Sequence, residues 1–498
     1  MSQNISAVHA RRASSGGARS FVAALAVLML AALFLSGCAG HAPRETAPPR
    51  FTELERHPQD LSVYAARAGG DRPLLDAATQ GAQDQRWNTR FFSPWAQTRT
   101  GVTVAEAATT APYLTKDGRT RGHAENLLPW DASRFAALVA NCDAPSFPAM
   151  AERGIIVRNT ALRELPTLRP SFTNPDKAGQ GYPFDDFQRS AVWTGTPVFV
   201  SHVSLDRAWL YCETGFASGW VPAEHVALAD ATFRALYQNG RYAAVLRDDV
   251  SLTSPNQTFI ATAHIGAVFP VAVESPGALT VLVPLRDADG RAVLGQSVLP
   301  AGYAAMKPLT ISAARMAEIG NRMMGQPYGW GGMYEDRDCS ATLRDLFAPF
   351  GIWLPRNSAS QARAGRFVDF GKASSDGKET IIRAQGVPFL TLLWLKGHIT
   401  LYLGEYDGHP VMFHNIWGLR VFSNSGEDGE RGQEGRFILG RAVVTSLRPG
   451  TELPNLTTPD GLVARMLGMS ILPGGAGLPG GAGLPGGAGL PGGAAVGQ

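Results

Sequence analysis

The sequence predicts a multidomain protein of the α+β class. Its 498 residues exceed the roughly 100–200 residues of an ordinary domain, so several folded units are expected. Helix-like stretches give way near residue 151 to short β-branched and aromatic runs, and after residue 310 a helical pattern is followed by strands. The hydrophobic content of 45% is enough for several cores, and a net charge of only +3 argues against a nucleic-acid-binding protein.

Residues 1–37 resemble the signal peptide of a bacterial lipoprotein. Three arginines precede an apolar run over residues 21–35, which is too short for a transmembrane helix, and the run ends in Leu-Ser-Gly-Cys at Cys38. The resemblance implies lipid on Cys38 and a location in the cell envelope, anchored in the periplasm. Because Ala39 follows, it points to the outer membrane. The alternative is a simple signal peptide with an incidental cysteine. With lipid on Cys38, the proline-rich residues 38–50 would form a tether from the membrane to the first domain.

Three folded segments and a tail are expected around the catalytic region. Residues 51–150 contain helix-like stretches without catalytic chemistry and predict a helical N-terminal domain. Residues 151–230 carry short strands punctuated by Gly, Pro and Asp and resemble a bacterial SH3-like β-barrel, and residues 235–305 resemble a second one. Residues 451–498 are assigned to a disordered tail, because the LPGGAG repeat that begins at Leu472 has almost nothing to bury.

Residues 310–450 carry the strongest signal for chemistry. Asp338 precedes apolar residues at helical spacing and is the predicted N-cap of a helix, which places Cys339 in the first turn. The positive end of a helix favours the thiolate, which is the nucleophilic form of cysteine. We therefore expect Cys339 to be a nucleophile with a lowered pKa.

Two histidines on neighbouring predicted strands are candidates for the base. A hairpin centred on Tyr406 would oppose His398 directly to His414, with Cβ atoms about 5 Å apart. One histidine could then orient the other, as the third member of a catalytic triad does. A tight turn at residues 407–408 would instead oppose His398 to Trp417, and the sequence is compatible with both registers.

The segments PYGWGG, DCSA, LPRNSASQ, GHITLYLG and FHN occur in the order found in the NlpC family of papain-like cell-wall peptidases, which residues 310–450 closely resemble. The resemblance implies a papain-like α+β catalytic domain at the C-terminal end. In it Cys339 is the nucleophile, His398 is the general base and His414 orients His398. The family motif usually reads DCSG, and Ala341 replaces its glycine here. Since alanine is small and favours helix, we expect little effect.

Further site residues follow from the same resemblance. Tyr328 would help the backbone amide of Cys339 to hold the oxyanion, and Asp338 and Ser340 would bind the amino end of the substrate. Paired SH3-like barrels before such a domain resemble γ-D-glutamyl-diamino-acid endopeptidases, in which the first barrel blocks the space beyond the substrate's free amine and contributes an aromatic residue. Trp193 stands in that position, with packing inside the barrel as the alternative.

These resemblances imply a cysteine endopeptidase that hydrolyses γ-D-glutamyl–diamino acid bonds in peptidoglycan stem peptides and prefers a free N-terminal L-Ala. The expected partners are stem peptides and, through the lipid, the membrane; no metal ion or other cofactor is expected. A non-catalytic wall-binding lipoprotein and an amidase or acyltransferase on the same scaffold are the alternatives. Cys142 and Cys212 either form a disulfide or, as we favour, stay buried thiols.

Overall fold

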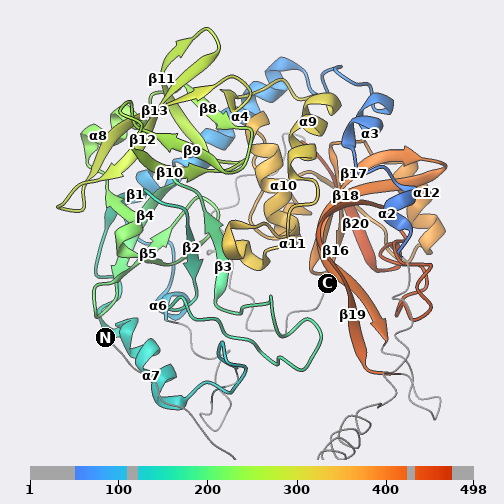
Figure 1. The fold of residues 1–498 in the computed structure, drawn as a ribbon, viewed down its shortest axis with the longest axis horizontal. Coiled ribbons are helices and arrows are strands. Elements are labelled where there is room, and N and C mark those ends of the chain that lie inside the picture. The colour runs from blue at the N-terminus through green and yellow to red at the C-terminus, as the bar shows by residue number, and fades with distance from the viewer. Residues whose placement is uncertain (1–50, 109–119, 121, 423–431, 474–498) are drawn as a thin grey trace, which may run out of the picture. The chain divides into compact units, whose positions relative to one another are not determined.

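A computed structural model of the chain describes residues 51–108, 120, 122–422 and 432–473 (Figure 1). The predicted signal peptide, the lipid-bearing Cys38 and the tether over residues 38–50 lie outside the described residues. No helix in the described part of the chain has the length and apolar character needed to cross a membrane.

The N-terminal region is helical, as the sequence predicts. Asp60, Asp76 and Asp131 each cap a helix by accepting a hydrogen bond from a backbone amide of the first turn. The helices are α2 (Glu53–Arg56), α3 (Leu61–Arg67), α4 (Ala77–Phe91), α5 (Ser93–Ala96), α6 (Val104–Ala107) and α7 (Ala132–Asn141). Aromatic residues of α4 and α5 pack against the first of the two following barrels, so the helical region is part of the same folded body.

The first barrel is an antiparallel sheet with the strand order β3-β2-β6-β5-β4-β1-β7. Its interior is apolar, and Val198, Val200 and Val221 are fully buried there. The strands are β1 (Glu152–Ile156), β2 (Thr160–Arg163), β3 (Gln188–Val192), β4 (Pro197–Val203), β5 (Trp209–Glu213), β6 (Ser218–Pro222) and β7 (Val226–Leu228).

Helix α8 (Ala231–Tyr237) leads into the second barrel. Its strands form a sheet of order β13-β12-β11-β8-β14 and a separate β10-β9 pair, around a core that includes Val281 and Phe269. The strands are β8 (Tyr242–Val245), β9 (Val250–Thr253), β10 (Phe259–Ala263), β11 (Val268–Ser275), β12 (Ala278–Arg286), β13 (Ala292–Pro300) and β14 (Ala304–Met306). The two β-rich domains that the sequence predicts over these segments are both present.

The C-terminal domain packs helices on an antiparallel sheet of order β15-β20-β16-β17-β18-β19. In Figure 1 helix α10 lies between this sheet and the barrels. The helices are α9 (Ala313–Met323), α10 (Cys339–Phe347), α11 (Ser358–Gln361) and α12 (Ser375–Gln385), with the short 3-10 segments η5 (Trp330–Glu335) and η7 (Val463–Arg465). The strands are β15 (Arg366–Asp369), β16 (Thr391–Leu395), β17 (His398–Tyr406), β18 (His409–Phe422), β19 (Glu434–Ser446) and β20 (Met466–Ile471).

The predicted start of the disordered tail at residue 451 is wrong, because part of residues 451–498 is folded. Strand β20 lies inside the sheet, paired with both β15 and β16, and Met466 and Met469 are buried in the core. The apolar run over residues 466–472 therefore has a partner on each side, although the glycine-rich repeat beside it suggested otherwise. Residues 474–498 lie outside the described part of the chain.

The β17–β18 hairpin adopts neither of the two registers considered above. Its turn is tight, because Tyr406 pairs with His409, but a β-bulge between Tyr402 and Gly404 shifts the register by one residue. Leu401 then pairs with Phe413, and the next step places Thr400, not His398, opposite His414. The two histidines are thus diagonal neighbours, which side chains of their length can still bridge.

The thiols of Cys142 and Cys212 are both free and buried, which is the alternative that we favoured over a disulfide. Cys142 packs with Trp130 and Phe135, whereas Cys212 packs with valines inside the first barrel. Their separate surroundings explain why the two sulfurs do not meet.

Candidate active site

Cys339 is the first residue of α10, with Asp338 as its N-cap. The Asp338 carboxylate accepts a 2.8 Å hydrogen bond from the backbone amide of Ala341, as the sequence pattern predicts. The backbone amide of Ile399 in β17 points at the Cys339 thiol. Because Ile399 follows His398 directly, the nucleophile lies at the start of β17, the strand that carries the predicted base.

The expected lowering of the Cys339 pKa does not occur. The side chain is only 4% exposed. Burial and the negative charge of Asp338 raise the pKa of the thiol to about 12, and they outweigh the backbone amides of Ile399 and Ser340 and the charge of Arg356, which lower it. The resting nucleophile is therefore a neutral thiol, and a base must remove its proton during the reaction.

A relay of hydrogen bonds fixes the tautomers of the two histidines. The Thr445 hydroxyl donates to the carbonyl of Ser446 at 2.8 Å, so its oxygen must accept the 3.1 Å bond from Nε2–H of His414. Nδ1 of His414 is then a bare acceptor and receives Nε2–H of His398 at 2.8 Å. Within the described residues Nδ1 of His398 has no hydrogen-bond partner, which leaves its lone pair available as a base.

Both histidines are neutral at physiological pH. Burial, and the positive charge of Arg465, lower the pKa of His398 to about 3. Burial and the neighbouring His398 hold the pKa of His414 well below its usual range. The site thus starts with an uncharged thiol and an uncharged imidazole, and the orientation of the imidazole is set by His414 and Thr445. Thr445 belongs to no recognisable sequence motif, which is why sequence reasoning missed it.

Asp338 and Ser340 do not offer free groups to a substrate amine. The Asp338 carboxylate accepts bonds from Ser340 Oγ, from the backbone amides of Ala341 and Gly331, and from two guanidinium nitrogens of Arg356 at 3.1 and 2.7 Å. Five donors fill the roughly four lone-pair positions of a carboxylate. Asp338 and Ser340 are thus held in a clamp with Arg356, whose charge keeps the pKa of Asp338 low against its burial. Their expected role in binding the amino end of the substrate stays a prediction.

Family models match four consecutive parts of this chain. The NLPC_P60 stabilising domain, N term, matches residues 27–147, an SH3 domain of SH3b1 type matches 170–222, and an SH3 domain of SH3b2 type matches 230–276. The NlpC/P60 family itself matches residues 325–425, which contain Cys339, His398 and His414. The chain belongs to the NlpC/P60 family. This family consists of cysteine peptidases that hydrolyse peptidoglycan, which supports cell-wall hydrolase activity for this member.

One solved structure shares the fold of this chain over most of its length. An NlpC/P60 endopeptidase from Photobacterium damselae subsp. piscicida is 26% identical, covers 84% of this chain and 98% of its own, and has a TM-score of 0.75. An NlpC/P60 family protein from Bacillus cereus is 18% identical over 64% of this chain and 98% of its own, with a TM-score of 0.42. The peptidoglycan hydrolase RipB from Mycobacterium tuberculosis is 26% identical over 25% of this chain and 58% of its own, with a TM-score of 0.13. No curated protein sequence matches.

The first SH3 domain packs directly against the loop that precedes the nucleophile. Gly331 and Gly332 have positive φ angles of 61° and 86° and lie flat on strand β3. A Cβ on Gly332 would stand 2.4 Å from the Cβ of Ala191, and the amide of Gln188 donates to the Gly331 carbonyl at 3.0 Å. The glycines of the PYGWGG segment are thus needed for close approach of two domains as well as for turn geometry.

Strand β3 also reaches the clamp on Asp338. Nε of Arg356 donates to the hydroxyl of Ser190 at 2.7 Å, and Ser190 belongs to the SH3 domain. Gln361 is fully buried and donates to the carbonyls of Ser340 and Pro355 at 2.8 Å each. The sequence reasoning assigned no role to Arg356 or Gln361, although both lie within the LPRNSASQ segment, which is the signal that could have pointed to them.

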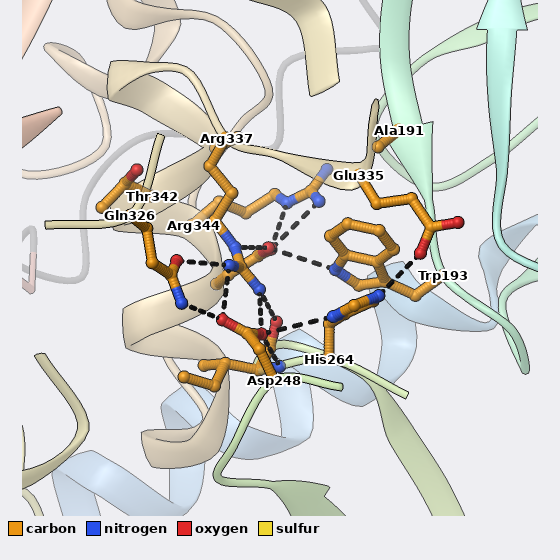
Figure 2. Close-up of polar contacts among 12 residues, drawn as sticks. Ala191, Trp193, Asp248, His264, Gln326, Glu335, Arg337, Thr342 and Arg344 are labelled. Carbon is orange, nitrogen blue, oxygen red and sulfur yellow. Dashed lines mark hydrogen bonds and ion pairs between the residues drawn. The ribbon is translucent and has the colours of Figure 1, made fainter. Parts of the chain in front are cut away.

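The second SH3 domain is joined to the NlpC/P60 domain by a buried ionic network around Arg337 (Figure 2). The Arg337 guanidinium contacts Asp248 of the SH3 domain at 2.7 Å and Asp345 of α10 at 2.8 Å. His264 bonds to Glu335 at 2.7 Å. Burial disfavours the charged imidazole, but hydrogen bonds to Asp248 and Glu335 outweigh it and raise the pKa of His264 to about 9.

Trp193 belongs to this network and is buried there. Its expected substrate-binding role stays a prediction. Its indole is 5% exposed, lies beside His264 in Figure 2, and donates to Asp345 at 3.1 Å. The Arg337 guanidinium stacks over the indole, 5.5 Å from the ring centroid. The alternative of a barrel-packing tryptophan is therefore the one that the geometry supports.

Tyr328 is buried at the start of the loop that leads to the nucleophile. Its backbone forms a parallel bridge with Arg337, two residues before Cys339, and its ring lies 6.1 Å from that of Trp417. Asn415 of β18 donates to the carbonyl of Arg337 at 2.8 Å and so fixes the end of the same loop. Asn415 is the last residue of the FHN segment, which gave the sequence signal for it.

Proposed function

We propose that this protein is a cysteine endopeptidase that hydrolyses the γ-D-glutamyl–diamino acid bond of peptidoglycan stem peptides. The observation that carries the proposal is the relay from Thr445 through His414 to His398, which leaves Nδ1 of His398 without a hydrogen-bond partner among the described residues, one residue before the backbone amide that contacts the Cys339 thiol. Membership of a family of peptidoglycan hydrolases supplies the substrate class.

The proposed reaction runs through a thioester. Nδ1 of His398 takes the thiol proton, and the sulfur of Cys339 bonds to the γ-carbonyl carbon. The backbone amide of Cys339, with Tyr328, is proposed to hold the oxyanion. His398 then returns its proton to the leaving nitrogen as the carbon–nitrogen bond breaks. A water molecule, deprotonated by His398, attacks the thioester, releases the D-glutamyl carboxylate and restores the thiol.

A preference for a free N-terminal L-Ala is a second part of the proposal. The close packing of strand β3 on Gly331 and Gly332, beside the clamp on Asp338, supports it, since the first SH3 domain occupies the space next to the nucleophile loop. The ammonium group of the substrate would have to share the Asp338 carboxylate with Ser340 and Arg356, which already donate hydrogen bonds to it.

The test is product analysis by mass spectrometry. L-Ala-γ-D-Glu-diaminopimelate should yield L-Ala-D-Glu and free diaminopimelate with the wild-type protein, and neither product with Cys339→Ala. Cleavage by Cys339→Ala at the wild-type rate would overturn the mechanism. Equal rates on the free stem and on the same stem attached to muramic acid would overturn the N-terminal preference alone.

We also propose that lipid on Cys38 anchors the protein in the cell envelope, at the periplasmic side of the outer membrane. The lipobox-like Leu-Ser-Gly-Cys after the apolar run supports this location. Membrane fractionation of wild type and Cys38→Ala tests it, because the variant should leave the membrane fraction. Unchanged fractionation would place the anchor elsewhere.

A further inference from the structure

Strand β19 is an edge strand of the sheet that carries the two histidines, and other segments cover its outer side. In the sheet that the structure describes, β18 is the one strand that pairs with it. Every second residue of an edge strand leaves its N–H and C=O unpaired unless another segment covers them. The backbone of Ala442 is covered by that of residues 325–326, through hydrogen bonds of 2.9 and 3.0 Å. The next two outward residues are Val444 and Ser446, which flank Thr445 in the chain.

Two side chains from the N-terminal region cover Val444 and Ser446. The Gln59 amide accepts the N–H of Val444 and donates to its carbonyl, both at 2.9 Å, which reproduces the bonds of a neighbouring strand. The carboxylate of Glu53 in α2 accepts the N–H of Ser446 at 2.6 Å. Glu53 and Val444 are both buried, so these bonds are shielded from water. Figure 1 shows α2 and α3 beside this sheet.

Glu53 and Gln59 are themselves held in place by neighbouring groups. The backbone amide of Glu53 donates to the carboxylate of Glu452 at 3.0 Å, and Nε2 of His57 lies 3.4 Å from the Glu53 carboxylate. The Gln59 amide also donates to the carbonyl of His57 at 2.8 Å. The two side chains therefore present fixed hydrogen-bonding groups to β19.

Thr445, between the two covered residues, is the outer member of the catalytic relay. Its hydroxyl donates to the carbonyl of Ser446 at 2.8 Å and accepts Nε2–H of His414 at 3.1 Å. A shift of this end of β19 would carry the hydroxyl away from the imidazole, and a hydrogen bond weakens steeply as its geometry departs from the ideal. The backbone bonds on both sides of Thr445 oppose such a shift.

We propose that Gln59 and Glu53 are positioning residues for the catalytic relay. They fix the backbone on both sides of Thr445, and Thr445 in turn holds His414 and His398 in the tautomers described above. The inference rests on the proposed function, in which His398 is the base. A purely structural anchor would stabilise the fold, but its effect on turnover would not depend on the Thr445 hydroxyl.

The experiment measures kcat, KM and Tm with L-Ala-γ-D-Glu-diaminopimelate as the substrate. Gln59→Ala should lower kcat by up to about tenfold, the range for losing one net hydrogen bond of the relay. KM should stay near that of wild type, because the relay acts on proton transfer. Glu53→Ala should also lower kcat, whereas Glu53→Gln keeps an oxygen for the Ser446 amide and should retain nearly wild-type kcat.

Asn321→Ala is the matched control. Asn321 of α9 accepts the backbone amide of Leu61 at 2.7 Å and donates to Asp60 at 2.6 Å, so it anchors the same N-terminal segment away from β19. This variant should lower Tm and leave kcat near that of wild type. Equal losses of kcat in Asn321→Ala and Gln59→Ala would reduce Gln59 to a general anchor and overturn the proposal.

A double-mutant cycle tests the route through Thr445. In a Thr445→Val background, Gln59→Ala should cause little further loss of kcat, because both changes act through the same hydroxyl. The same loss in both backgrounds, or wild-type kcat in Gln59→Ala, would overturn the positioning role. If wild type released no diaminopimelate from the peptide, the proposed function itself would fail.

A spectroscopic measurement covers the case in which Gln59→Ala does not fold. Gln59→Glu keeps the oxygen that accepts the Val444 amide and loses only the donor. Nitrogen-15 NMR of the imidazoles in Cys339→Ala should show His414 with its proton on Nε2, and adding Gln59→Glu should shift this signal or mix the two tautomers. An unchanged signal would contradict the proposal without any reference to turnover.

Discussion

Thr445→Val should slow the enzyme while leaving its fold intact. Valine keeps the shape of threonine but removes the hydroxyl that accepts Nε2–H of His414 at 3.1 Å. His414 would then lose the contact that holds its proton on Nε2, and its other tautomer would place N–H against N–H of His398. One net hydrogen bond is worth about 0.5–1.5 kcal/mol, so kcat/KM should fall by up to about tenfold.

The assay is steady-state hydrolysis of a stem peptide, with thermal unfolding measured in parallel. Thr445→Ser keeps the hydroxyl and should retain nearly wild-type kcat/KM, which separates the relay from packing. If Thr445→Val matched wild type, or if the serine variant were equally slow, the assignment of tautomers through Thr445 would be refuted.

Three further outcomes follow from the structure. Asp338→Asn should destabilise the protein by about 3–5 kcal/mol in urea titrations, because it leaves the buried Arg356 without its counter-ion; Glu274→Gln, in an exposed pair, should cost under about 1 kcal/mol. Gly332→Ala should lower Tm and activity more than Gly240→Ala, which has a similar φ of 84° but nothing within 4 Å of its Cβ, and equal effects would argue against the close contact. Unfolded chains protonate histidine near pH 6.5 whereas the native pKa of His398 is about 3, so stability should fall on acidification by up to about 1.4 kcal/mol per pH unit; His398→Asn should show a shallower fall between pH 7 and 5.

Much of the fold follows from local patterns in the sequence. Asp338 before a helically spaced apolar set predicted the start of α10, and the punctuated β-branched runs predicted the barrels. Strand β20 was not predicted, because a short apolar run next to glycine repeats has no periodicity of its own. Its two partner strands also come from segments about 75 to 100 residues earlier in the chain. The register of the histidine hairpin depends on a bulge after Tyr402 that no turn signal specifies.

The electrostatics of the site could not be predicted from neighbours in sequence. The helix start suggested a lowered thiol pKa for Cys339, but burial and the charge of Asp338 dominate once the chain is folded. The sequence neighbours of Asp338 suggest a carboxylate available to a ligand. In the folded chain Arg356, 18 residues later, donates two hydrogen bonds to that carboxylate. Both differences have one cause, because sequence adjacency reveals which groups are present but not which of them already have partners.

The packing of Gly331 and Gly332 on strand β3 has a mechanical consequence. The SH3 domain and the nucleophile loop share backbone-level contacts, with no room for a linker or a layer of side chains between them. The barrel therefore cannot rotate relative to the nucleophile loop, and it moves together with Cys339. Any ligand bound by the barrel will therefore lie at a set distance from the bond that is cut. The position of cleavage along the polymer then depends on this fixed distance, in addition to the chemistry of the residues on either side of the bond.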